Sequence, residues 1–119
     1  MKTAVIGLGN MGSVHAEIVQ EQGNDLVAVC DIDTAKLENY PDSAHYTDYV
    51  EMLDKEHPDV VHVCTPHYLH AEMIIAALER GVNVLCEKSL CIREEDIPRI
   101  LEAEEKSSAI LAVCHQNRY

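Results

Sequence analysis

Short apolar runs recur along the chain and are separated by longer stretches in which apolar residues return at helical spacing. The runs at 2–6, 25–30, 59–64, 82–86 and 109–114 are nearly all apolar, and 44–46 is a weaker candidate. Strands that are buried on both faces of a sheet have this continuous apolar character. The pattern therefore predicts six strands.

The stretches between these runs predict helices at 11–22, from Thr34 to Pro41, at 47–55, from Pro66 to Gly81, and at 95–106. Gly23 and Gly81 are the expected stops, and Thr34 and Thr47 the expected N-caps. The residues expected to face the sheet are Met11, Val14, Ile18 and Val19 in the first helix, and Ile97, Ile100 and Leu101 in the last.

Strands that alternate with helices predict an α/β fold with a doubly wound parallel sheet. Right-handed crossovers make 3-2-1-4-5-6 the leading strand order, which is the Rossmann order. A length of 119 residues, without a linker or an internal repeat, predicts a single domain.

The charge balance narrows the classes of partner. Nine basic and 21 acidic residues give a net charge of −12, which disfavours nucleic acid and anionic membrane surfaces as partners. No apolar run approaches the length of a membrane span, and the apolar start is too short and too interrupted by glycine for a signal peptide. The five cysteines form no C-x-x-C pair, so we expect free thiols and a cytoplasmic protein.

The first strand leads into a glycine motif, G-L-G-N-M-G, at Gly7 to Gly12. Gly7 permits a tight turn, Gly9 lets a pyrophosphate approach the backbone, and Gly12 lets the next helix pack closely on the sheet. The loop residues Leu8, Asn10 and Met11 would line the phosphates, which lie at the positive end of that helix. The alternative is a plain turn between a strand and a helix.

Asp31 ends the second strand, 31 − 12 = 19 residues after the last glycine. A carboxylate at this place accepts hydrogen bonds from an adenosine ribose and repels a 2′-phosphate. The following residues, Ile32, Asp33 and Thr34, include no cation. We therefore predict that the chain binds NAD rather than NADP, with Asp31 and Ile32 in the site. Asp31 as a simple loop cap is the alternative.

The fifth run stops at "CEKSL", where Glu87 and Lys88 adjoin the expected carboxyl end of a strand, the edge at which doubly wound sheets bind ligands. Together, "AVIGLGNMGSVHA", "CDID", "VCTPHYLHAEM", "GVNVLCEKSL" and "CHQNRY" resemble the Gfo/Idh/MocA oxidoreductases over the whole chain. These are NAD(P)-dependent enzymes, many of which act on sugars, inositols and related polyols.

The resemblance implies hydride transfer between nicotinamide and a secondary alcohol. It assigns a catalytic or positioning role to Lys88 and places Glu87 beside the nicotinamide ribose. It also assigns cofactor contacts to Cys64, Thr65, Pro66 and His70 after the fourth strand, and to Asn117 after the sixth. Alternatively, Lys88 is a solvated charge or an ion-pair partner of Glu87.

Two features depart from the family pattern. Ser89 stands where the family has proline, so the loop carrying Lys88 lacks a fixed φ. Family members also continue into a second α/β domain that completes the substrate site and supports homo-oligomers, whereas this sequence stops at Tyr119. We expect the 119 residues alone to show little or no turnover. The other classes considered are a stand-alone NAD-binding regulatory module and an oligomer subunit that has lost catalysis.

Four of the five cysteines close predicted strands, and several histidines lie near them, so a soft-metal site is conceivable. Cysteine also behaves as a small hydrophobe in a buried strand, and the spacings match no zinc pattern. We therefore predict no metal site.

Overall fold

The computed structural model describes residues 2–8, 10–21, 23, 25–64, 70–87 and 97–114, and of residues 10–13, 15, 70, 87, 113 and 114 it describes the backbone alone. Its centre is a six-stranded parallel sheet in the order β3-β2-β1-β4-β5-β6. This confirms the predicted fold class and topology. The strands are β1 (Lys2–Ile6), β2 (Asp25–Cys30), β3 (Ala44–Tyr46), β4 (Val60–Val63), β5 (Asn83–Glu87) and β6 (Leu111–Cys114).

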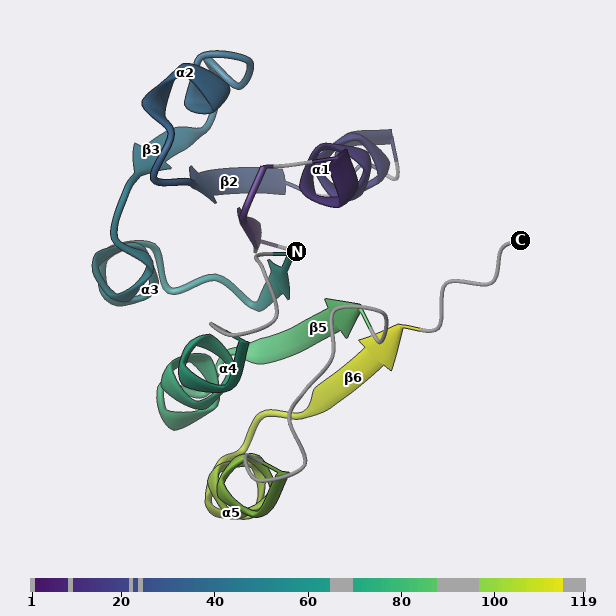
Figure 1. Cartoon of the computed structure of the whole chain (residues 1–119), viewed down its shortest axis with the longest axis vertical. Helices are drawn as coiled ribbons and strands as arrows, with labels where there is room; N and C mark the ends of the chain where they lie inside the picture. Colours follow the sequence, from purple (N-terminus) through teal and green to yellow (C-terminus); the bar gives the residue numbers. More distant parts are fainter. Residues whose placement is uncertain are drawn as a thin grey trace.

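Helices cover the two faces of the sheet unequally (Figure 1). The helices are α1 (Asn10–Glu21), α2 (Thr34–Leu37), α3 (Tyr49–Glu56), α4 (His70–Glu79) and α5 (Ile97–Lys106). The larger core cluster joins α3, α4 and α5 to one face of the sheet. The smaller cluster joins α1 and the end of α2 to the other face.

The central strands are buried on both faces, which explains their continuous apolar sequence. In β1, Ala4 and Ile6 belong to the larger cluster, whereas Val5 between them belongs to the smaller one. All three side chains are at most 1% exposed. The glycine turn that follows β1 therefore starts from a rigid, fully packed strand.

The helix ends confirm the predicted stops and correct the predicted caps. Gly23 and Gly81 have φ values of 78° and 74°, a left-handed conformation that glycine adopts without strain. The N-caps are Asp33 and Asp48, whose side chains accept from the amides of Ala35 and Val50. The prediction of Thr34 and Thr47 was wrong by one residue at each helix, because an aspartate beside each threonine supplies the capping oxygen.

The helix faces were predicted only in part. In α1, Val19 is buried, but Val14 and Ile18 are 45% and 42% exposed. In α5, Ile100 is buried, but Ile97 and Leu101 are 42% and 55% exposed. Each helix thus packs a narrower stripe on the sheet than its apolar residues suggest.

Candidate cofactor site

The glycine turn is tied to strands on both of its sides. Gly7 follows β1 with φ of 90°, as its predicted role in a tight turn requires, and its amide donates to the carbonyl of Cys30 at 2.8 Å. On the other side, the amide of Cys64 donates to the carbonyl of Ile6 at 2.8 Å. The carboxyl ends of β1, β2 and β4 are therefore held together at this edge of the sheet.

Asp31 lies against this turn and is fixed at both carboxylate oxygens. Oδ2 accepts from the amide of Leu8 at 2.7 Å, and Oδ1 accepts from the amide of Asp33 at 2.8 Å. Its own amide donates to the carbonyl of Tyr46 at 3.1 Å, at the end of β3. The carboxylate is half-buried. It is therefore oriented by the backbone, and each oxygen retains lone pairs for a ligand.

The residues beside Asp31 differ sharply in exposure. Ile32 is 90% exposed, which places an apolar side chain in solvent next to the oriented carboxylate. Leu8 is only 5% exposed and packs in the smaller core cluster. The glycine turn is therefore anchored in the core through Leu8, whereas the apolar side chain of Ile32 is exposed to solvent.

Helix α1 begins at Asn10, directly after the turn, and has no acidic residue in its first turn. The N-terminus of a helix attracts anions through its free amides and its dipole. A negative ligand could bind here in spite of the net charge of −12. In open α/β sheets, this crevice beyond the strand ends is where ligands bind.

The cysteines near the site are buried. Cys30, Cys64 and Cys86 are in the reduced form. Burial, together with the charges of Asp31 and Asp48, raises the pKa of Cys30 to about 12. Its thiol is therefore protonated at neutral pH and is a poor nucleophile and metal ligand. Within the described ranges, no group of three His, Cys, Asp or Glu side chains is arranged to hold a metal ion.

Several predicted site residues lie outside the described residues, namely Gly9, Thr65, Pro66, Lys88 and Asn117. The backbone alone is described for Asn10, Met11, Gly12, His70 and Glu87. Glu87 is the last residue of β5, paired with Cys114 of β6, rather than the first residue beyond the strand. The predicted strand at 82–86 was thus placed one residue early.

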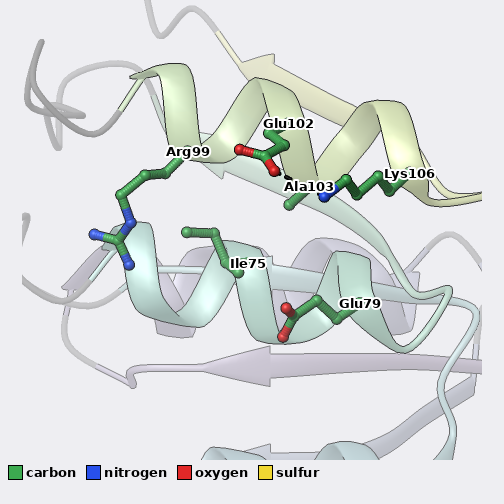
Figure 2. A pocket seen from close by; sticks show the side chains of 6 residues that line it. All are labelled: Ile75, Glu79, Arg99, Glu102, Ala103 and Lys106. Atoms are coloured by element: carbon green, nitrogen blue, oxygen red, sulfur yellow. Dashed lines mark hydrogen bonds and ion pairs between the residues drawn. The ribbon is translucent and has the colours of Figure 1, made fainter.

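A groove between α4 and α5 lies apart from this edge of the sheet. Figure 2 shows its lining, which includes Ile75, Glu79, Arg99, Glu102, Ala103 and Lys106. Arg99 pairs with Glu72 at 2.7 Å, and Lys106 pairs with Glu102 at 2.7 Å. These are exposed ion pairs between and along helices, so we regard the groove as part of the helix packing.

The sequence interpretation missed the contribution of Asp33. Asp33 caps α2 and also donates its amide to Asp31, so it helps to orient the carboxylate. The signal was present as D-I-D before T-A-K-L. An aspartate that accepts from the amide two residues later forms a local turn, and an aspartate before a helical segment is a preferred N-cap.

The chain is similar to known dehydrogenases. It is 34% identical over 112 residues to the inositol 2-dehydrogenase of Arthrobacter sp. (strain FB24), covering 89% of this chain and 33% of that protein. It is 32% identical over 125 residues to the D-glucoside 3-dehydrogenase of Escherichia coli (strain K12), covering 100% of this chain and 36% of that protein. It therefore spans about a third of the length of these relatives.

Solved structures agree with the observed fold. The myo-inositol 2-dehydrogenase of Lactobacillus plantarum matches with a TM-score of 0.87 and 31% identity, over 96% of this chain and 36% of that one. The WlbA dehydrogenase of Chromobacterium violaceum, in complex with NADH and UDP-GlcNAcA, matches with a TM-score of 0.88 and 28% identity. The match covers 96% of this chain and 34% of that one.

The sequence profile of the Gfo/Idh/MocA proteins, described as an oxidoreductase family with an NAD-binding Rossmann fold, matches residues 1–115. Together with the glycine turn, the oriented Asp31 and the six-stranded sheet, this match establishes that the chain belongs to the Gfo/Idh/MocA oxidoreductase family and forms its NAD-binding Rossmann domain.

Proposed function

We propose that NAD binds across the carboxyl edge of the sheet, with its pyrophosphate over Gly7 to Gly12 and its adenosine ribose on Asp31. The observation that carries this proposal is the hydrogen bond from the amide of Leu8 to the Asp31 carboxylate, at 2.7 Å. That bond joins the acid to the glycine turn, so both parts of the dinucleotide fingerprint lie at one place. The remaining lone pairs of the carboxylate would accept hydrogen bonds from the ribose hydroxyls.

The same carboxylate favours NAD over NADP. A 2′-phosphate would be repelled by the nearby charge of Asp31, which is half-buried. Asp33 adds a second carboxylate nearby, and this one is exposed. Within 31–34 there is no Lys or Arg to neutralise the phosphate. Ile32, 90% exposed, would cover one face of the adenine and lose that exposure on binding.

The parent reaction is hydride transfer between the nicotinamide ring and a secondary alcohol of an inositol, a sugar or a related polyol. The support is family membership and the activities named for the relatives, inositol 2-dehydrogenase and D-glucoside 3-dehydrogenase. The bound cofactor supplies the hydride acceptor. The protein positions the alcohol carbon and manages the hydroxyl proton.

We assign the proton-handling or positioning role to Lys88, with Glu87 beside the nicotinamide ribose. Cys64, which is 8% exposed, directly follows β4. We also propose cofactor contacts for Cys64 and for Thr65, Pro66 and His70, which follow it in the sequence. Asn117, after β6 in the sequence, is the last proposed contact.

The full-length protein would also carry a second domain that completes the substrate site and supports a homo-oligomer. In keeping with this, the chain covers only 33% and 36% of two dehydrogenase relatives. The buried, reduced cysteines Cys30, Cys64 and Cys86 suit a reducing compartment such as the cytoplasm. The structure adds that no helix within its described ranges has the length and apolar character needed to cross a membrane.

The enzymatic proposal is tested with the full-length protein by following NADH formation with myo-inositol and a panel of glucosides. Lys88→Met should lower kcat by at least about 100-fold, since general acid–base groups contribute on this scale. NADH affinity should stay within about twofold. Lys36→Met, at an exposed position of α2, is the matched control and should leave both quantities unchanged. A Lys88→Met enzyme with normal kcat would contradict the assignment, and NADH binding without turnover of any polyol or sugar would favour the non-catalytic module.

A further inference from the structure

The peptide group that joins Cys30 to Asp31 is held on both of its sides. Its carbonyl, on Cys30, accepts from the amide of Gly7 at 2.8 Å, and its N–H, on Asp31, donates to the carbonyl of Tyr46 at 3.1 Å. One peptide plane therefore connects the glycine turn to the end of β3. Since a peptide group is planar, the two bonds together restrict how the backbone at Asp31 can rotate.

Tyr46 is the outer of these two supports, and the strand that carries it is short. β3 contains three residues and lies at the edge of the sheet, next to β2 (Figure 1). Gly7, in contrast, follows β1, which pairs with β2 on one side and with β4 on the other. A three-residue edge strand is weakly held by its backbone bonds, so the position of the Tyr46 carbonyl depends on further contacts.

The side chain of Tyr46 supplies such a contact. Its hydroxyl donates to Oε2 of Glu56 at 2.5 Å. Glu56 is the last residue of α3, and the C-cap His57 closes that helix with its amide on the carbonyl of Leu53 at 3.2 Å. The hydroxyl is protonated at neutral pH, because its bond to Glu56, together with burial and nearby carboxylates, raises the pKa of Tyr46 to about 12. The end of β3 is thus tied to the end of α3 by a hydrogen bond to a carboxylate, which is stronger than a bond between neutral groups.

A second side-chain bond holds β3 at its other end. Ser43, directly before the strand, is 8% exposed and donates its hydroxyl to the carbonyl of Leu26 at 2.7 Å. This bond lies at the amino end of β3, whereas Asp31 follows the carboxyl end of the parallel strand β2. Both side-chain bonds therefore support the same strand, but only the bond of Tyr46 is made by the residue that contacts Asp31.

We propose that Tyr46 is a positioning residue for cofactor recognition, and that its bond to Glu56 keeps the Asp31 carboxylate aligned with the glycine turn. This inference rests on the proposed function, in which Asp31 accepts hydrogen bonds from the adenosine ribose. When the hydroxyl is lost, the end of β3 relaxes, the peptide between Cys30 and Asp31 follows, and the bond from the Leu8 amide weakens. The carboxylate then meets the ribose at a poorer angle, so NADH binds more weakly. NADPH is affected less, because a phosphate replaces its 2′-hydroxyl.

The substitution Tyr46→Phe removes the hydroxyl and keeps the ring. In calorimetric titrations of the full-length protein, it should raise the Kd of NADH by about three- to tenfold and leave the Kd of NADPH within about twofold. In NMR spectra without cofactor, the amide proton of Leu8 should move toward its position in Asp31→Ala, because its bond to the carboxylate weakens. Ser43→Ala is the matched control, since it removes one hydrogen bond at the other end of β3. It should lower Tm by roughly the same few degrees as Tyr46→Phe and change neither the NADH affinity nor the Leu8 amide.

Two variants of Glu56 test the same bond from its other side. Glu56→Ala should weaken NADH binding as much as Tyr46→Phe does, with no further loss in the double variant. Glu56→Gln keeps an oxygen that accepts from the hydroxyl, so its NADH affinity should stay within about twofold of the wild type. Unchanged NADH affinity and an unchanged Leu8 amide in Tyr46→Phe would overturn the inference. Equal effects of Ser43→Ala and Tyr46→Phe would also overturn it, since any loosening of β3 would then suffice. Normal NADH binding by Asp31→Ala would overturn the cofactor proposal as well, whereas weaker binding by Asp31→Ala and normal binding by Tyr46→Phe would overturn this inference alone.

Discussion

The substitution Asp31→Ala tests whether one carboxylate both supports the glycine turn and recognises the cofactor. It removes the acceptors of two backbone amides, those of Leu8 and Asp33. The Asp33 amide is exposed, so water replaces its lost bond at little cost. The Leu8 amide lies at a part-buried position, and losing a charged acceptor there costs roughly 1–2 kcal/mol. For a chain of this size we expect Tm to fall by roughly 5–10 °C.

The same substitution should weaken NADH binding by at least about tenfold, because the ribose hydroxyls lose a charged acceptor. Asp31→Asn separates the two roles. Its side-chain oxygen can still accept from Leu8, so Tm should stay nearer the wild type, while the loss of charge should narrow the preference for NADH over NADPH. Asp33→Ala is the control: it removes the N-cap of α2, costs about 1 kcal/mol of stability and should leave NADH affinity within about twofold.

Thermal melts followed by circular dichroism and calorimetric titrations with NADH and NADPH measure both effects. Unchanged NADH affinity in Asp31→Ala would refute recognition of the ribose by this carboxylate. An unchanged Tm would refute its role in holding the turn.

Three further predictions concern the turn, a tyrosine and a thiol. Gly7→Ala and Gly23→Ala both place a side chain on a residue with positive φ, at 90° and 78°. Each should lower the free energy of unfolding by about 1–2 kcal/mol in thermal melts. Only Gly7→Ala should weaken NADH binding in titrations, and equal NADH affinities of the two variants would contradict this. A hydrogen bond from the Tyr46 hydroxyl to Glu56 at 2.5 Å, with burial and nearby carboxylates, raises the pKa of Tyr46 to about 12. The stability that the neutral hydroxyl contributes is therefore complete below pH 10 and lost as the pH rises through 12. Ultraviolet titration should show this late ionisation, and pH-dependent melts of Tyr46→Phe should lack the loss of stability. The Cys30 thiol, with its pKa of about 12, should resist iodoacetamide at pH 8 until guanidinium unfolds the chain, as peptide mapping can show; rapid native labelling would contradict its burial.

The topology followed from the sequence because its causes are local and repetitive. Parallel strands buried on both faces require unbroken apolar runs, and right-handed crossovers then leave one leading strand order. The glycine turn was predictable for a similar reason, since only glycine adopts the φ of Gly7 without strain. Both features depend on backbone rules that a single sequence displays.

Other features depend on tertiary contacts and were predicted poorly or not at all. Val14 and Ile18 have the spacing of a buried face, yet they are 45% and 42% exposed, because α1 packs on the sheet through a narrower stripe that contains Ala16 and Val19. The bond between Asp31 and Leu8 joins residues 23 positions apart and has no periodic signature. The caps were misplaced because aspartate and threonine are adjacent and both are acceptable N-caps.

The structure describes Asp31, the residue that we propose as the acceptor for the adenosine ribose. Two amides orient its carboxylate, and its contact with a ribose stays a prediction from its position after β2. The nicotinamide side, with Lys88 as its central residue, is a prediction from the family resemblance and from the position of Glu87 at the end of β5.

We propose that this chain binds NAD through the glycine turn and Asp31. Calorimetric titration of the 119-residue chain with NADH and NADPH, in parallel and in the same buffer, tests it most directly. We expect saturable binding of NADH at one site and at least about tenfold weaker binding of NADPH. Equal or tighter binding of NADPH would contradict the role of Asp31, and binding of neither would contradict a cofactor site formed by this domain alone.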